Sequence, residues 1–186
     1  TTGKKTNDST LIAGDIPFGE VQLRDGNTGE IILKFDKGSQ PLLSTNGKWL
    51  VYNVRDEGID TWNMQNNQAG LRLNLDFYTI PQLVFSPDSK MIAAALQDNS
   101  IRVWDVEKGF ASNALGGPLV PVTDFVFSND GSYIIAAVGG SVWWWNLVTD
   151  EADHLDLFDI VYNDTPYGYG RTYPDVVTTV SINSTN

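Results

Sequence analysis

The chain has 186 residues, of which 41% are hydrophobic and 11% aromatic, so its length and composition predict one globular domain. Its 12 basic and 23 acidic residues give a net charge of -11, which makes nucleic acid and anionic membranes unsuitable partners. The absence of cysteine excludes disulfides and thiolate metal sites, and no apolar run approaches the roughly 18 residues of a membrane span, so we expect a soluble chain whose compartment stays open.

The N-terminal part of the chain consists of polar residues followed by short apolar runs. Residues 1–9 are polar and predict either a loose terminus or half of a hairpin. Short β-rich runs broken by Gly, Asn, Asp, Ser or Pro predict strands joined by tight turns. On this basis we expect strands at 10–14, 20–24 and 30–35. They correspond to the second, third and fourth strands of a unit whose first strand is missing.

Three complete four-stranded units follow. The expected strands are 41–44, 49–54, 58–62 and 71–75 in the second unit, 82–85, 91–96, 100–104 and about 111–115 in the third, and 123–127, 133–138, 141–145 and about 153–157 in the fourth. The rhythm then breaks until a last expected strand at 177–183. Its ending, Ser184-Thr-Asn186, matches Ser44-Thr-Asn46, which indicates a first strand without a successor.

The units repeat with a period close to 42 residues. Ser86 has counterparts 42 residues before and after it, at Ser44 and Ser128, and the third strands end in Trp-Asn or Trp-Asp. A period in this range with four strands per unit is typical of a β-propeller. Ser-Pro-Asp-Ser-Lys at 86–90 and Ile-Arg-Val-Trp-Asp at 101–105 resemble the Trp-Asp (WD) repeat family.

This resemblance implies an all-β fold, a β-propeller of four-stranded antiparallel blades. We expect a single unit over 1–186, closed by a blade shared between the N- and C-terminal strands or by pairing with another chain. The expected blades are 177–186 plus 1–37, 38–76, 77–117 and 118–157, with an insertion loop at 158–176. Because the family commonly forms larger rings, a closed four-bladed ring, two chains in one eight-bladed ring and a segment of a longer propeller all remain open.

Several positions match the structural positions of the family repeat. They are Asp56, Trp62, Asp98, Trp104 and Trp145. The Gly-His pair common in the family is absent from every unit, so the implied hydrogen-bond relay between His, Asp, Ser or Thr and Trp is incomplete. Blade rigidity is therefore expected to depend on packing. Arg24 stands at the Trp position of the first unit, which makes that blade the most divergent.

No motif in the chain predicts catalysis. The acidic segment 150–159 contains His154, the single histidine, but lacks the ligand spacing of a metal-binding loop. It is better explained as an outer strand whose charges discourage strand pairing. No nucleophile elbow, P-loop or dinucleotide motif is present. We therefore expect no enzyme, no catalytic residue, no metal and no cofactor.

Candidate partner-binding residues lie mainly on one end of the blades. Turns between second and third strands, blade-to-blade connections and the insertion loop emerge there. Trp143 shares its strand face with polar positions in the other units, so it either anchors a partner or covers a neighbouring loop. The candidates are Phe18, Arg55, Phe77, Tyr78, Trp143, Tyr162, Tyr167, Tyr169, Arg171 and Tyr173.

These features favour a non-catalytic platform that binds a protein partner or another copy of itself, for example as a homodimer forming a larger ring. Tyr and Arg among glycines are typical of binding loops. Two alternatives stay open: a small-ligand, carbohydrate-binding or hydrolytic propeller, and a sensor or regulatory region of a larger multidomain protein.

Overall fold

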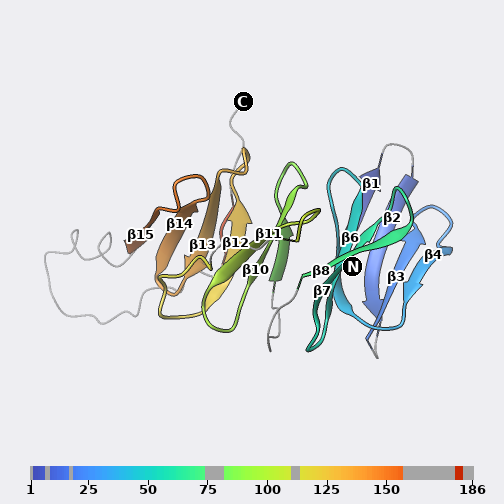
Figure 1. Cartoon of the computed structure of the whole chain (residues 1–186), viewed down its shortest axis with the longest axis horizontal. Coiled ribbons are helices and arrows are strands. Elements are labelled where there is room, and N and C mark those ends of the chain that lie inside the picture. The colour runs from blue at the N-terminus through green and yellow to red at the C-terminus, as the bar shows by residue number, and fades with distance from the viewer. Residues whose placement is uncertain are drawn as a thin grey trace, which may run out of the picture.

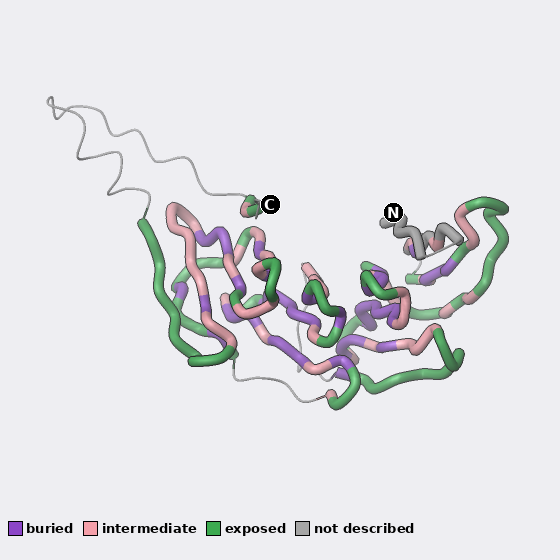
Figure 2. Tube along the Cα trace, turned by 90° about the horizontal axis from the view of Figure 1, so that it is seen from above, coloured by how far each residue is buried: buried purple, intermediate pink, exposed green. Residues whose placement is uncertain are grey.

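The computed structural model describes residues 2–6, 9–16, 19–73, 82–109, 114–156 and 179–181. These residues form fifteen strands in four antiparallel sheets, arranged one after another in an open arc (Figures 1 and 2). No helix among them is long and apolar enough to cross a membrane. The predicted all-β architecture of consecutive antiparallel blades is confirmed, and within the described residues the arc is not closed into a ring.

The first sheet contains an innermost strand within residues 1–9, for which the sequence predicted either a loose terminus or half of a hairpin. Its strands are β1 (Thr2–Thr6), β2 (Ser9–Ile16), β3 (Glu20–Asp25) and β4 (Ile31–Phe35), in that order. β1 and β2 form an antiparallel hairpin, which confirms the hairpin alternative for residues 1–9 and corrects the expectation that the first strand of this unit is missing. A hairpin needs only a short loop, so it closes at a lower entropic cost than a strand from the far end of the chain.

The expected C-terminal strand is only partly within the described residues. Residues 179–181 are described and are not in a strand. The Val180 N–H donates to Asp124 Oδ2 at 3.0 Å, so this segment lies beside the innermost strand of the last sheet. The predicted strand residues 177, 178, 182 and 183 lie outside the described residues.

The second and fourth sheets have the predicted four strands. These strands are β5 (Ser39–Leu43), β6 (Trp49–Val54), β7 (Gly58–Asn63) and β8 (Gln68–Leu73), then β12 (Val122–Phe127), β13 (Tyr133–Val138), β14 (Ser141–Asn146) and β15 (Ala152–Asp156). β8 begins three residues before its predicted start. The reason is a tight turn after β7 that ends at Asn67, whose φ of 56° returns the chain at once to the sheet.

The third sheet contains three strands in its described part. They are β9 (Gln82–Phe85), β10 (Met91–Ala95) and β11 (Ile101–Asp105), in the order β11-β10-β9. The expected fourth strand near 111–115 falls partly outside the described residues. Where the chain is described again, Leu115 forms a single antiparallel bridge with Ile101, at the edge where a fourth strand would pair.

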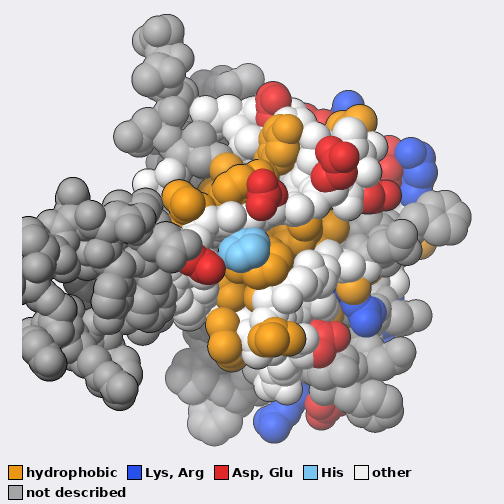
Figure 3. Space-filling model, turned by 90° about the vertical axis from the view of Figure 1, so that its left-hand side faces the viewer, with side chains coloured by type: hydrophobic (Ala, Val, Ile, Leu, Met, Phe, Trp, Pro, Cys, Tyr) orange, Lys and Arg blue, Asp and Glu red, His pale blue; other side chains and the backbone are white. Residues whose placement is uncertain are grey.

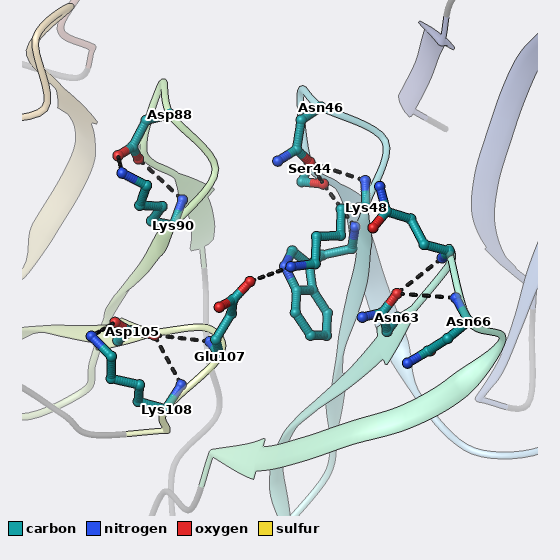
Figure 4. A network of polar contacts seen from close by, with 12 residues as sticks. Ser44, Asn46, Lys48, Asn63, Asn66, Asp88, Lys90, Asp105, Glu107 and Lys108 are labelled. Atoms are coloured by element: carbon teal, nitrogen blue, oxygen red, sulfur yellow. Dashed lines mark hydrogen bonds and ion pairs between the residues drawn. The ribbon is translucent and has the colours of Figure 1, made fainter.

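A serine and an Asn or Asp side chain build the same turn in three sheets. The Ser44 hydroxyl donates to Asn46 Oδ1 at 2.8 Å and accepts from the Trp49 N–H at 2.8 Å, while the Lys48 N–H donates to Asn46 Oδ1 at 3.0 Å (Figure 4). Ser86 with Asp88 and Ser128 with Asp130 repeat this arrangement. The repeat spacing of serine therefore has a structural cause, because each serine closes the turn between the first two strands of its sheet.

The Asp or Asn that follows the third strand caps the next turn. Asp105 Oδ1 accepts the N–H groups of Glu107 and Lys108, both at 2.9 Å (Figure 4). Asp25, Asn63 and Asn146 make the corresponding contacts in the other sheets. The Asp or Asn of each Trp-Asp or Trp-Asn pair is thus explained by its side chain, which accepts backbone N–H groups of the turn that follows.

Three apolar layers join the four sheets face to face. The layer between the first and second sheets contains Val21, Leu23, Leu50 and Tyr52. Val51, Ile59, Ile92 and Trp104 belong to the layer between the second and third sheets. Ala93, Val103, Phe125, Ile134 and Trp145 belong to the layer between the third and fourth. Alternate residues of a strand point to opposite faces, so the middle sheets have two apolar faces.

Candidate interaction surfaces

The turns between second and third strands emerge at one end of the blades, as predicted. Arg55 lies in such a turn with 94% of its side chain exposed, and Gln97 and Asp98 are exposed in the equivalent turn of the third sheet. Leu119, in the connection to the last sheet, is 93% exposed. Phe18, Phe77, Tyr78, Tyr162, Tyr167, Tyr169, Arg171 and Tyr173 lie outside the described residues, so their role stays a prediction.

Trp143 covers a neighbouring part of the chain. Its ring stacks on that of His154 with centroids 4.4 Å apart and on that of Trp145 at 5.9 Å. It also lies against the backbone of Gly117, where an added Cβ would be 2.5 Å from Trp143 Cζ3. Trp143 is therefore packed against other residues of the chain but is only half-buried, and its role in partner binding stays a prediction.

Among the structural tryptophans, Trp104 and Trp145 are buried and Trp62 is half-buried, and the polar partners of their indoles differ from sheet to sheet. Trp145 Nε1 donates to the Gly116 carbonyl at 3.0 Å, whereas Trp62 Nε1 is buried without a hydrogen-bond partner among the described residues. Asp98 accepts the hydroxyl of Ser100 at 2.5 Å and its N–H at 3.0 Å, and these bonds lower the pKa of Asp98. Asp56 stands in an exposed turn with a φ of 61°. Local contacts and packing thus hold the turns, as expected from the incomplete relay.

The acidic segment forms an outer strand, as predicted. Its residues Ala152–Asp156 are β15, at the outer edge of the last sheet, and all five are exposed. The described residues contain no group of three or more His, Cys, Asp or Glu side chains that could hold a metal ion.

The last sheet has one face that no other described sheet covers; we call it the open face. It is built from alternate residues: Val126, Ile135, Val142 and Trp144, flanked by Tyr133, Leu155 and Asp153, all assigned by strand register. Ala137 shares this side of the sheet but is fully buried. Figure 3 shows hydrophobic and acidic side chains side by side at this end of the molecule. At the inner edge, Asp124 accepts Gln82 Nε2 at 2.8 Å and the Val180 N–H, so this edge is occupied.

The open face contains a hollow of about 350 Å³ beside Trp144. Its walls are Tyr133, Trp144, Asn146, Glu151, Ala152 and Asp153. Two aromatic rings and two carboxylates line one space, and this chemistry suits a cationic side chain such as that of arginine or lysine.

The opposite end of the arc carries a polar surface, the polar face of the first sheet. Its polar side chains are Glu20, Gln22, Arg24 and Lys34, which connect in one ladder. Gln22 is only 9% exposed, and Ile31, which pairs with Arg24, is exposed. Lys34 Nζ is 2.5 Å from Glu20 Oε2, Gln22 Nε2 donates to Glu20 Oε1, and Arg24 Nε donates to Gln22 Oε1 at 2.9 Å. The bond to Lys34, and then that to Gln22, lowers the pKa of Glu20, while Glu20 raises the pKa of Lys34.

Sequence reasoning missed Trp144 and the open face. The available signal was the alternation in Ser141–Asn146, which places Trp144 on the face opposite to Trp143 and Trp145. Its equivalents are Thr61 in the second sheet, which faces the third sheet, and Val103 in the third sheet, which faces the fourth. Only the three-dimensional arrangement shows that no described sheet follows the last one.

The architecture is that of a row of propeller-like blades, each packed on the next. Residues 77–105, which include β9, β10 and β11, match the WD40 family model, described as WD domain, G-beta repeat. This stretch is a WD repeat, and the predicted resemblance is confirmed there. A comparison of the sequence with curated proteins gives no match. WD-repeat domains in general mediate interactions between proteins and are typically non-catalytic.

Proposed function

We propose that the chain is a non-catalytic protein–protein interaction unit that binds its partner through the open face of the last sheet and the exposed turns around Arg55. The observation that carries this proposal is the apolar open face. Its residues occupy the register positions that another sheet covers in the second and third sheets. Contiguous apolar surface with a polar rim is typical of a protein-binding site.

The residue types on the open face also favour binding. Trp144 and Tyr133 are aromatic side chains of the kind that dominate binding energy at protein interfaces. Glu151 and Asp153 stand beside them and can select a partner by its charge. The exposed turns and the loop residues predicted from the sequence would extend this surface at one end of the blades.

The experiment compares proteins retained by the immobilised wild-type chain with those retained by Trp144→Ser. We expect proteins bound by the wild type to be lost from this variant, because a central aromatic anchor is removed. Val148→Ser is the matched control, since Val148 is 80% exposed in a turn of the same sheet and lies off the open face. Equal retention by wild type and Trp144→Ser would overturn binding through the open face.

The predicted binding loop needs a separate test. Deleting residues 162–173 removes the Tyr- and Arg-containing segment and is expected to reduce partner retention, as is Arg55→Glu. If retention by both variants equals that of the wild type, the turn and loop residues are not part of the interface.

A further inference from the structure

The two end surfaces of the arc belong to opposite sides of the blade. Arg24 of the first sheet pairs with Ile12. The tryptophans of the next two sheets make the equivalent pairs, Trp62 with Leu50 and Trp104 with Ile92. The polar face is therefore the side of the first sheet on which the other sheets carry these tryptophans, and we call this side the tryptophan side. In the third and fourth sheets the tryptophan side packs on the preceding sheet. The open face is the other side, which a following sheet would cover. The register therefore permits the polar face to dock on the open face, head to tail.

The charges of the two surfaces are complementary. The open face carries Glu151 and Asp153 around its hollow. The polar face presents Arg24, which is exposed and uses two of its five donors in bonds to Gln22 Oε1 and to the Gly29 carbonyl, 2.9 and 2.7 Å long. A guanidinium between carboxylates and aromatic rings gains both ionic and cation–π interactions.

The packing of the second and third sheets shows where Arg24 would lie. There, Glu107 in the turn after β11 pairs with Lys48 of the preceding sheet (Figure 4). Gly109 in the same turn is so close to Leu71 that an added Cβ would be 2.9 Å from Leu71 Cδ1. The equivalent turn of the first sheet contains Gly29, to which Arg24 is bonded. Asp60 pairs with Arg72 as the equivalent Trp143 pairs with His154, so the residue before each corresponds as well, and the equivalent of Leu71 is Asp153.

We propose that the partner of the open face is a second copy of the chain, whose first sheet docks on it with Arg24 in the hollow beside Trp144. This rests on the proposed function and names its partner. One chain cannot make this contact with itself in the described arc, because its first and last sheets lie at opposite ends (Figure 2). Two copies joined by two such contacts form a closed two-fold assembly of eight sheets, without free end faces.

The test uses the absence of cysteine from the chain. Arg24→Cys and Asp153→Cys are made in separate proteins, mixed and oxidised, and the products are separated under non-reducing conditions. The proposal expects a disulfide-linked dimer that contains one chain of each variant. The control mixture of Lys90→Cys with Asp153→Cys should give only background cross-linking, because Lys90 is 79% exposed and lies off both end surfaces. Equal cross-linking in both mixtures would overturn the proposal.

Molar mass from light scattering gives an independent result. We expect a mass above the 20.5 kDa of one chain, and a dissociation constant raised at least about tenfold by Arg24→Glu, because one partner of an interfacial charge pair is reversed. Combining Arg24→Glu with Asp153→Arg should restore association. Lys90→Glu makes the same charge change at a side chain that is 79% exposed and lies off both end surfaces, so it should leave the mass unchanged. The unfolding transition of each variant verifies that it is folded.

The outcomes separate this proposal from the proposed function. A mass of one chain at all concentrations, together with release of other proteins by Trp144→Ser, would overturn self-docking and leave the interaction function standing. Head-to-tail cross-linking without any other retained protein would support self-docking. The interaction function of the chain would then be its own assembly.

Discussion

The first and last sheets share one strand order but present opposite surfaces at the two ends of the arc. On the first sheet, Glu20, Gln22, Arg24 and Lys34 satisfy one another's polar groups, and the charged ends of Arg24 and Lys34 are exposed to water. On the last sheet, apolar residues around Trp144 occupy the equivalent end position, and contact with water is unfavourable for them. One end therefore tolerates solvent, while the other gains free energy when a partner covers it.

The residue at the end of the third strand differs between the first sheet and the later sheets, and the difference follows from whether a preceding sheet covers it. Tryptophan at the end of the third strand fills the layer between two sheets, and Trp104 and Trp145 are each only 2% exposed. Arg24 at the same position has no preceding sheet to fill among the described residues. Its replacement of tryptophan fits a surface exposed to water in the single chain and able to pair with carboxylates on another surface.

The largest expected effect compares the two faces of the last sheet. Phe125 is fully buried on the covered face, and Phe125→Ala should lower the free energy of unfolding by about 3–5 kcal/mol through lost burial and a cavity. Trp144→Ala removes a side chain packed on one side only, and we expect a loss of about 1–2 kcal/mol. Urea unfolding at low protein concentration measures both. Equal losses would contradict the assignment of an open face.

A second test concerns the tryptophan that is packed within the chain. Gly117 has a φ of 130°, and an added Cβ would clash with the ring of Trp143. Gly117→Ala should destabilise the fold by about 2 kcal/mol, from overpacking and backbone strain together. Gly116→Ala is the matched control, because an added Cβ there meets nothing within 4 Å. If the two variants have the same unfolding midpoint in urea, Trp143 is not held against this segment.

Most strands could be predicted because their determinants are local. The turn formed by Ser86 and Asp88 and the turn capped by Asp105 each fix a strand end within a few residues, so β9 and β10 begin where predicted. The first strand of the first sheet could not be assigned in this way. β1 has a polar sequence, and its place depends on competition between a near hairpin partner and a distant strand.

The candidate surface was harder to predict for a related reason. Strand alternation places Trp144 opposite Trp145, but the sequence does not say whether that face is covered. Whether another sheet covers that face depends on how many sheets follow the last one. The three consecutive tryptophans at 143–145 do not differ in residue type, so the sequence does not show which of them is covered. The packing of Trp143 on Gly117 likewise depends on a connection that the repeat pattern does not specify.

A smaller effect compares two structural tryptophans. Trp145→Phe removes the indole N–H that donates to the Gly116 carbonyl, and should lower the free energy of unfolding by about 1–2 kcal/mol. Trp62→Phe removes a buried N–H that has no partner among the described residues, so its loss should be smaller by about 1 kcal/mol. Urea unfolding of both variants gives the difference. A larger loss in Trp62→Phe would mean that packing, and not hydrogen bonding, ranks these positions.

The smallest expected effect is on the pH dependence of stability. It concerns a carboxylate in a turn, Asp130, in contrast to the charged residues of the two end faces. Bonds from the Ser128 hydroxyl and from the N–H and hydroxyl of Ser132 lower the pKa of Asp130 from 3.8 to about 2. Because the folded state holds the carboxylate in its charged form, this contribution is complete above pH 3.8 and is lost as the pH falls through about 2.

Asp130→Asn tests this assignment with a residue that the chain already uses, since Asn46 occupies the same place in the second sheet. The variant should keep the turn and lose less stability than the wild type as the pH falls from 3.8 to about 2. Urea unfolding over this range measures the difference, and parallel curves would contradict it. Self-association at neutral pH should not change, because Asp130 lies in a turn and off the open face. A change in the dissociation constant of the variant would indicate that this turn is part of the interface.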